Sequence, residues 1–199
     1  MKKVILTFLL QAAFAEPSAK LIGLAEQGYN YAKQHNIAKG PMVVIVDFSK
    51  PSNEKRLWVY NLDEHKTKFS AYVAHGKRSG FLNSTSFSNA RSSYKSSIGF
   101  YQILEQYNSK HHGLSIKLNG LESTNNNAYK RGIVIHSAKY VDRNFIKKNH
   151  RAGRSWGCFA VSKQAENTII KLTHKNDLLL AYYPSQSWLS SSKFLNRIS

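Results

Sequence analysis

The chain has 199 residues, of which 42% are hydrophobic; this length and composition fit one globular domain and exclude a disordered or fibrous protein. Lysine and arginine total 29 against 11 for aspartate and glutamate, so the formal net charge is +18. The basic residues are spread along the chain without a nucleic-acid-binding motif. The charge therefore indicates attraction to an anionic surface, and no nucleic-acid partner is expected.

Residues 1–15 have the pattern of a secretory signal peptide. Lys2 and Lys3 precede an apolar run over residues 4–10, and Ala13 and Ala15 are the small residues expected before a cleavage site. The run is too short to cross a bilayer, which takes about 20 apolar residues, and no later segment predicts a transmembrane helix. We therefore expect an exported protein of the periplasm or cell envelope, whose charge falls from +18 to +16 when the two lysines are removed.

From residue 16 onward the patterns predict one domain, over residues 16–199, that is mainly β with flanking helices. A helix is expected over about residues 18–36, with Ser18 as its N-cap, and shorter helices are expected after Asp142 and Ser162. Strands are expected where β-branched and apolar residues run together or alternate with polar ones, at residues 42–48, 57–62, 69–74, 98–104, 114–121, 132–135 and 178–183. This number of strands favours a mixed, sheet-rich domain.

Two segments lack such periodicity. Residues 76–97 are rich in serine, glycine, asparagine and basic residues, and loops of that length are usually functional or disordered. The tail over residues 185–199 is serine-rich apart from a few large apolar residues, among them Trp188 and Phe194. We expect this tail to pack loosely.

Cys158 is the only cysteine of the chain. In an exported protein it has no partner for an internal disulfide, so it is inert, bonded to another molecule, or reactive. It lies in a glycine-containing loop, and His136 ends a predicted buried strand. An imidazole can take the proton of a thiol, and the N–H groups near Gly157 can bind an oxyanion. Each residue alone is better explained by a structural role, but together they predict an acyl-transfer enzyme with Cys158 as nucleophile and His136 as base.

Several further stretches accompany this pair in order along the chain. They are Ala74-His75-Gly76-Lys77, Phe87-Ser88-Asn89, residues 96–101, residues 119–122 and Arg154-Ser155-Trp156-Gly157-Cys158. Together with the strand-end histidine, they make the run from about residue 72 to residue 183 resemble the murein L,D-transpeptidase catalytic domain family of the YkuD type. The Ser-x-Gly-Cys pattern that ends at Cys158 is the most specific part of this resemblance.

The resemblance implies an L,D-transpeptidase-like mixed β-sandwich with the catalytic cysteine on a loop. It also implies a peptidoglycan L,D-transpeptidase, in which the cysteine attacks the carbonyl after the L-centre of diaminopimelate in a stem tetrapeptide. D-Ala leaves, a thioester forms, and an amine of a second stem peptide accepts the acyl group. Carried over to this chain, Cys158 is the nucleophile and His136 the base, the main-chain carbonyl of Ser137 orients the imidazole, and Ser155 and Gly157 shape the oxyanion loop.

The chain departs from the family pattern beside both residues. Ser137 stands where glycine commonly follows the histidine, and Trp156 stands where many members carry histidine. The arginine that often follows the cysteine is replaced by the stretch 159–161, and Arg154 is a candidate to supply its charge. Substrate contacts are expected from Arg154, Ser155, Trp156, His75, Gly76, Ser88 and Asn89.

The residues leave alternatives open. Water in place of the amine would make the protein an L,D-carboxypeptidase or endopeptidase, and a non-catalytic envelope-binding module is a further reading. Arg154 is equally well explained as a solvated charge and His75 as a turn residue, whereas Ser88 and Asn89 are better explained as organisers of their loop. His111 and His112 are adjacent and lack a cluster of other ligands, so neither a metal nor another cofactor is expected. The expected partners are peptidoglycan stem peptides, and the protein is expected to be a monomer.

Overall fold

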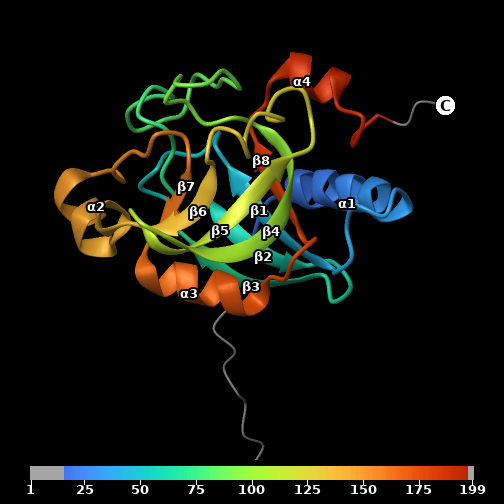
Figure 1. The fold of residues 1–199 in the computed structure, drawn as a ribbon, viewed down its shortest axis with the longest axis horizontal. Helices are drawn as coiled ribbons and strands as arrows, with labels where there is room; N and C mark the ends of the chain where they lie inside the picture. Colours follow the sequence, from blue (N-terminus) through green and yellow to red (C-terminus); the bar gives the residue numbers. More distant parts are fainter. Residues whose placement is uncertain (1–15, 197–199) are drawn as a thin grey trace, which may run out of the picture.

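An eight-stranded mixed sheet is the centre of the structure, a computed structural model that describes residues 16–196 (Figure 1). The order across the sheet is β3-β2-β1-β8-β4-β5-β6-β7. The strands are β1 (Met42–Asp47), β2 (Leu57–Asn61), β3 (Lys66–Ala71), β4 (Gly99–Ser109), β5 (Gly113–Gly120), β6 (Val134–Ser137), β7 (Phe159–Val161) and β8 (Leu178–Tyr182). The expected mainly-β fold with flanking helices is confirmed. The strand that the sequence patterns missed is β7, which is too short to show alternation.

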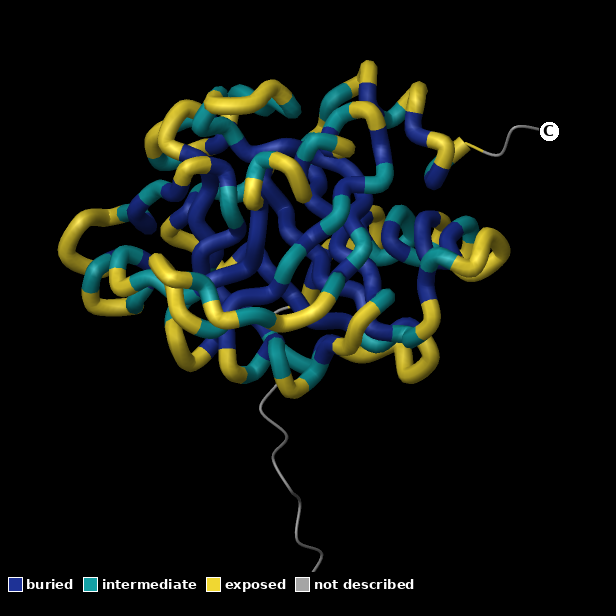
Figure 2. Tube along the Cα trace, viewed as in Figure 1, coloured by how far each residue is buried: buried dark blue, intermediate teal, exposed yellow. Residues whose placement is uncertain are grey.

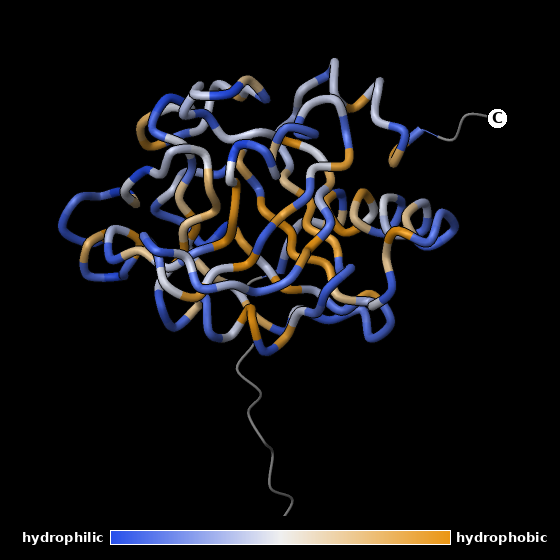
Figure 3. The backbone as a smooth tube through the Cα atoms, in the orientation of Figure 1, coloured by the Kyte–Doolittle hydropathy of each residue, from blue (hydrophilic) through white to orange (hydrophobic). Residues whose placement is uncertain are grey.

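The central strands explain the apolar runs of the sequence. β1 and β8 are parallel neighbours, and every residue of both strands is buried. Strands covered on both faces carry continuous apolar runs, which is what residues 42–48 and 178–183 show. The tube through the middle of the molecule is accordingly dark blue for burial in Figure 2 and orange for hydropathy in Figure 3. This core is the rigid support of the strands that carry the candidate site.

The two edges of the sheet meet each other. β3 and β7 are the edge strands, yet the chain after β3 hydrogen-bonds to the chain around β7: the N–H of Ala74 donates to the carbonyl of Ala160 at 2.9 Å. The N–H of Ser155 donates to the carbonyl of His75 at 2.9 Å, and Gly76 forms a parallel bridge with Ser155. The sheet therefore closes on itself. This closure places the start of the long loop, at Gly76, beside the loop that precedes Cys158.

Helices cover the closed sheet. α1 (Ala19–Gln34) packs on β1 and β8 and lies where a helix was expected, with the Ser18 hydroxyl accepting from the N–H of Leu21 at 3.4 Å. α3 (Lys163–Leu172) contacts both β3 and β6, and Ser162 caps it through the N–H of Ala165 at 3.2 Å. A short 3-10 helix, η1 (Lys139–Val141), leads into α2 (Arg143–Asn149), and α4 (Gln186–Ser191) follows β8. No helix of the described residues is long and apolar enough to span a membrane. The predicted signal segment 1–15 lies outside the described residues.

The C-terminal segment is packed, so the expectation of loose packing is wrong. Trp188 and Phe194 are 1% and 2% exposed, and Phe194 stacks on Phe100 with 4.9 Å between ring centroids. The indole N–H of Trp188 donates to the buried carboxylate of Glu122 at 3.1 Å. The apolar residues of the tail are too sparse to form a sequence pattern, and their burial depends on a site that β4 and the residues after β5 provide.

Candidate active site

His136 lies on β6, and Cys158 directly precedes β7, the strand that pairs with β6. β6 and β7 are parallel, with Ile135 opposite Phe159 and His136 opposite Ala160. Ile135 and Phe159 point into the main core. Because side chains alternate along a strand, His136 projects on the opposite side of β6 from Ile135, whereas the half-buried Cys158 packs against the main core. The register of the two short strands thus places the main chain of Cys158 beside β6, two residues before Ala160, which pairs with His136.

The imidazole of His136 is held in one tautomer. Its Nδ1 lies 3.0 Å from the carbonyl oxygen of Ser137. A carbonyl only accepts, so Nδ1 carries the hydrogen and Nε2 keeps its lone pair while the ring is neutral. Burial lowers the pKa of His136, and the neighbouring His112 lowers it further. The ring is therefore a neutral base near pH 7, oriented by the carbonyl that the family resemblance implied.

Glu166 supports this arrangement from α3, and the sequence patterns did not single it out. Its carboxylate is fully buried, and Oε1 accepts a hydrogen bond from the N–H of Ser137 at 2.7 Å. Lys163 donates to the other oxygen. The sequence holds one signal for it, since Glu166 follows Ala165 on the helix side that also buries Ile169, and a buried carboxylate needs partners.

The thiol of Cys158 is half-buried, and its hydrogen bond goes to the carbonyl oxygen of Gly132, with Sγ at 3.5 Å. Within residues 16–196 no hydrogen bond joins this thiol to the His136 ring, whose Nδ1 is engaged by Ser137. Burial raises the pKa of the Cys158 thiol, while the positive charge of Arg131 acts in the opposite direction. The thiol and the imidazole are thus both neutral in this resting arrangement, with no preformed thiolate–imidazolium pair.

The loop before Cys158 is tied by Ser155. The Ser155 hydroxyl donates to the carbonyl of Cys158 at 2.7 Å and accepts from the N–H of Gly157 at 3.1 Å. Gly157 has a φ of +122°, and a Cβ there would lie 2.7 Å from the carbonyl oxygen of Lys95, so glycine is required. The N–H of Gly157 is therefore used inside the loop.

Arg131 is a second residue that the sequence patterns missed. Its guanidinium donates to the carbonyls of Ser88 and Lys95, at 2.8 and 2.5 Å, and to the hydroxyls of Ser93 and Ser97. None of these partners is a carboxylate, so its positive charge is not neutralised and acts on Cys158. Arg131 also fixes the long loop beside the cysteine loop, and in Figure 1 that loop is the green chain at the upper left.

Cations and exposed rings gather beside the cysteine loop. Trp156 and Phe81 are 69% and 60% exposed, Lys77 lies 4.7 Å from the centre of the Tyr94 ring, and Arg151 lies 4.1 Å from that of Phe81. We call this group the basic rim; it consists of Lys77, Arg78, Phe81, Tyr94, Arg151, Arg154 and Trp156. None of the ion pairs among residues 16–196 includes a cation of the basic rim.

The other predicted contact residues lie deeper or serve the loop. His75 is fully buried and receives a hydrogen bond from Arg56 at 2.9 Å, so its side chain does not face a ligand in this structure. Gly76 bridges Ser155, as described above. Asn89 donates to Ser123 and Asn126 and accepts from the N–H of Asn127. Its role is to organise the loop, and Ser88 contributes its carbonyl to Arg131.

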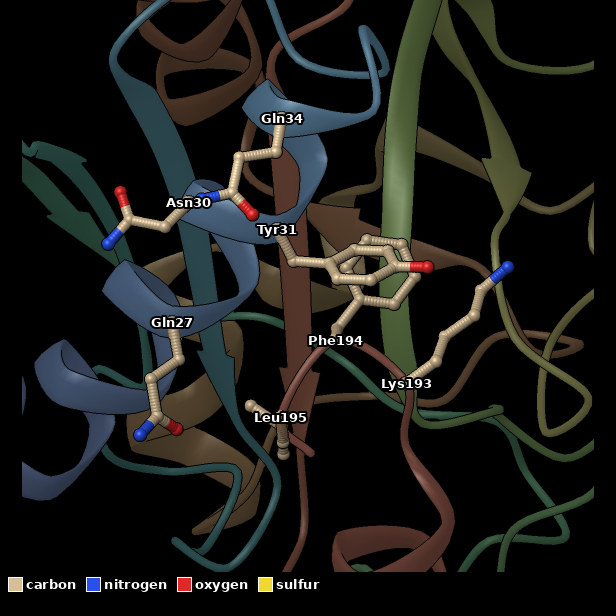
Figure 4. A pocket seen from close by; sticks show the side chains of 7 residues that line it. All are labelled: Gln27, Asn30, Tyr31, Gln34, Lys193, Phe194 and Leu195. Atoms are coloured by element: carbon tan, nitrogen blue, oxygen red, sulfur yellow. The ribbon is translucent and has the colours of Figure 1, made fainter. Parts of the chain in front are cut away.

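Two other features lie apart from this region. No group of three or more histidine, cysteine, aspartate or glutamate residues within 16–196 is arranged to hold a metal ion. Figure 4 shows a pocket between α1 and the C-terminal segment, lined by Gln27, Asn30, Tyr31, Gln34, Lys193, Phe194 and Leu195. None of these residues belongs to the candidate site.

The chain is similar to several known L,D-transpeptidases. A family model described as "L,D-transpeptidase catalytic domain" matches residues 15–182. Solved structures of L,D-transpeptidases from Mycobacterium smegmatis, Stackebrandtia nassauensis and Enterococcus faecium are 9%, 15% and 9% identical, with TM-scores of 0.46, 0.46 and 0.44. The alignments cover 72%, 82% and 73% of this chain, and 59%, 68% and 50% of those chains. This chain thus spans about half to two thirds of their length. No curated protein matches it.

Proposed function

Since the chain belongs to the L,D-transpeptidase catalytic domain family, we propose that it is a peptidoglycan L,D-transpeptidase with Cys158 as nucleophile and His136 as general base. The observation that carries the proposal is the position of Cys158 directly before β7, beside the strand β6 that carries His136, with Nδ1 of His136 engaged by Ser137. Its site of action is the cell envelope, reached by export, and its basic surface suits an anionic polymer. It acts as a monomer.

Activation of the thiol is the first step. Rotation about the Cα–Cβ bond of Cys158 turns Sγ away from the carbonyl of Gly132 and toward His136. Nε2 of His136 then takes the thiol proton, because Nδ1 already carries a hydrogen. The raised thiol pKa and the lowered imidazole pKa keep the pair neutral at rest, so the proton moves as the substrate is attacked.

Acylation follows from this proton transfer. Sγ of Cys158 bonds to the carbonyl carbon after the L-centre of diaminopimelate, and the carbonyl oxygen becomes an oxyanion that the N–H of Cys158 stabilises. The bond to D-Ala then breaks, and the imidazolium of His136 gives its proton to the departing amine. The products are free D-Ala, a thioester on Cys158 and a neutral imidazole.

Transfer repeats these steps with a new nucleophile. An amine of a second stem peptide attacks the thioester carbon while His136 takes one of its protons. The carbon–sulfur bond breaks, and the proton returns from His136 to the thiolate of Cys158. The result is a peptide bond between two stems and the original neutral pair. Water in place of the amine gives a shortened, uncross-linked stem.

The basic rim is the proposed contact surface for the substrate. Trp156 directly precedes Gly157, and Arg154 stands four residues before Cys158, so both lie in the loop that leads to the thiol. Arg154 donates to the carbonyls of Lys77 and Gly80, at 3.0 and 3.2 Å, and uses neutral acceptors only. Its charge is available to a carboxylate of the stem peptide. Ser155 and Gly76 shape the loop that precedes Cys158. Ser88, Asn89 and His75 do not contact the substrate in this proposal and support the loops beneath the basic rim.

Muropeptide turnover tests the proposal. The purified protein is incubated with disaccharide tetrapeptides, and the products and the protein are followed by mass spectrometry. We expect release of D-Ala, an acyl adduct on Cys158, and a dimer joined through two diaminopimelate residues. Cys158→Ala should abolish all three, while His35→Ala, a substitution of a remote exposed histidine, should leave them unchanged.

The products distinguish the transpeptidase from the alternative functions. A monomeric tripeptide without dimer would identify a carboxypeptidase with the same nucleophile. Turnover that persists in Cys158→Ala would contradict the mechanism. Binding of tetrapeptides without any turnover would identify a non-catalytic envelope-binding module.

A further inference from the structure

The turn between β4 and β5 brings a second histidine onto the proposed base. His112 directly precedes Gly113, the first residue of β5, and Ser115 of that strand pairs with His136. The rings of His112 and His136 are stacked, with 4.0 Å between their centroids and 27° between their planes. The two histidines are far apart in sequence, and only the pairing of β5 with β6 puts their rings in contact.

Burial differs sharply between the two rings. His136 is 2% exposed, whereas His112 is an exposed residue at the tip of the hairpin. One face of the His136 ring is therefore covered by His112 and not by the core of the protein. The hydrogen bond from Nδ1 to Ser137 fixes one edge of the ring, but a single bond permits the ring to tilt about it. The stacked ring of His112 removes this remaining freedom.

We propose that His112 is a positioning residue for the base: its stacked ring fixes the plane of His136, keeps Nε2 in the orientation that takes the thiol proton, and shields that ring from water. The inference rests on the proposed function, because it assumes that His136 deprotonates Cys158. Its contribution is geometric, through stacking, and does not need a proton on His112.

Charge adds a pH dependence to this contact. The titratable groups that act on His136 are His112 and Glu166, which lies behind Ser137, while His111 is the neighbour of His112. A proton on His112 places a like charge against the imidazolium that forms during attack, so acid weakens the base. Replacing His112 with an uncharged aromatic ring removes this repulsion and raises the pKa of His136, which moves the acid limb of activity to higher pH.

The fold does not depend on His112, which makes the inference testable. The β4–β5 pairing runs from Tyr101 with Gly120 to Ser109 with Gly113 and does not include His112. Its ring contacts are with His111 and His136. His112→Ala removes the stacked ring, His112→Phe keeps a ring without a titrating group, and His111→Ala is the matched control on the same turn.

The experiment follows alkylation of Cys158 by iodoacetamide from pH 5 to 9, together with tetrapeptide turnover. Cys158 is the only cysteine, so every alkylation event reports on this thiol. We expect His112→Ala to slow both reactions by about 10- to 100-fold near pH 7, the scale of loss for a misplaced catalytic group. His112→Phe should recover most of the rate, with its acid limb at higher pH, and His111→Ala should match the wild type.

The outcomes are distinguishable from failure of the proposed function. Equal rates and equal pH profiles in His112→Ala and the wild type would overturn the inference, as would a His112→Phe variant as slow as His112→Ala. If His136→Ala itself leaves alkylation and turnover unchanged, the proposed function fails first. Circular dichroism of each variant shows whether the fold is kept, and nitrogen chemical shifts of the His136 ring report its tautomer without any substrate.

Discussion

The buried carboxylate of Glu166 accepts a hydrogen bond from the N–H of Ser137 at 2.7 Å, and the carbonyl of the same serine holds the imidazole of His136. The helix α3 therefore helps to set the position of the imidazole through the main chain of Ser137. The family motif, defined by the histidine and the cysteine, does not include Glu166. A ring held by main chain tolerates the serine that replaces the common glycine, since any residue supplies the carbonyl.

The Glu166 support predicts that Glu166→Gln slows acylation while the protein stays folded. The amide oxygen still accepts from Ser137, but the negative charge that raises the pKa of His136 is lost, so the imidazolium is less stable. We expect about a 10-fold loss, within the range of general-base effects. Single-turnover acylation measures it, with the exposed Glu105→Gln as control. A rate equal to the wild type would remove Glu166 from the mechanism.

Removal of the base should have a larger effect. We expect His136→Ala to slow acylation by roughly 10²- to 10⁴-fold, the usual contribution of a general base. Circular dichroism should show an unchanged fold. Because burial lowers the pKa of His136, the acid limb of the wild-type rate should lie below the ordinary histidine value of 6.5. An acid limb above that value would contradict the assignment of His136 as a buried neutral base.

Arg131 should lower the pKa of the Cys158 thiol. Replacing it with methionine removes the positive charge that opposes the effect of burial, so the pKa of Cys158 should rise further. Iodoacetamide alkylation measured against pH should then reach half its maximum at higher pH. The matched control is the exposed Arg91→Met, which should show the wild-type profile. A profile that does not move in Arg131→Met would mean that its role is only to hold the loop.

The basic rim should act on binding more than on chemistry. In the proposed mechanism, Arg154 pairs with a substrate carboxylate and does not touch the reacting atoms. Arg154→Met should therefore raise KM for tetrapeptides about 10-fold with kcat nearly unchanged, the effect of losing one charge-assisted hydrogen bond of about 1.5 kcal/mol. The same readout applies to Trp156→Ala. Lys147→Met, on the outer side of α2, is the control. A fall in kcat at constant KM would contradict this role.

The buried His75 should make stability depend on pH. Burial, followed by the charge of Arg56, lowers the pKa of His75 from 6.5 to about 4. Between these values the unfolded chain binds the proton and the folded chain does not, so the free energy of unfolding should fall as pH drops through this window. At about 1.4 kcal/mol for each unit, the loss approaches 3 kcal/mol at pH 4.

Urea unfolding between pH 4 and 7 measures the contribution of His75 to the free energy of unfolding. The contribution is the difference between the wild type and His75→Asn, whose amide oxygen can still accept from Arg56. Other buried groups titrate in both proteins and cancel in the difference. The variant should show a flatter dependence on pH. Parallel curves for the two proteins would contradict the buried neutral state of His75.

The elements that the sequence determined are those whose signal is local. Ser18 and Ser162 cap their helices where the patterns indicated, because a cap depends on a few adjacent residues. Continuous apolar runs in the sequence predicted the buried strands β1 and β8. The prediction of Cys158 as nucleophile and His136 as base used only residue types and loop composition, and both can be read from the sequence.

The tertiary structure decided what depends on distant contacts. β7 is defined by its parallel partner β6, and the burial of Trp188 needs the carboxylate of Glu122. Glu166, Arg131 and His112 reach the site from a helix, a turn and a hairpin that sequence order does not place together. Their roles follow from strand register and from the closure of the sheet between Ala74 and Ala160. Such contacts form only when separate elements pack against each other, so no local pattern contains them.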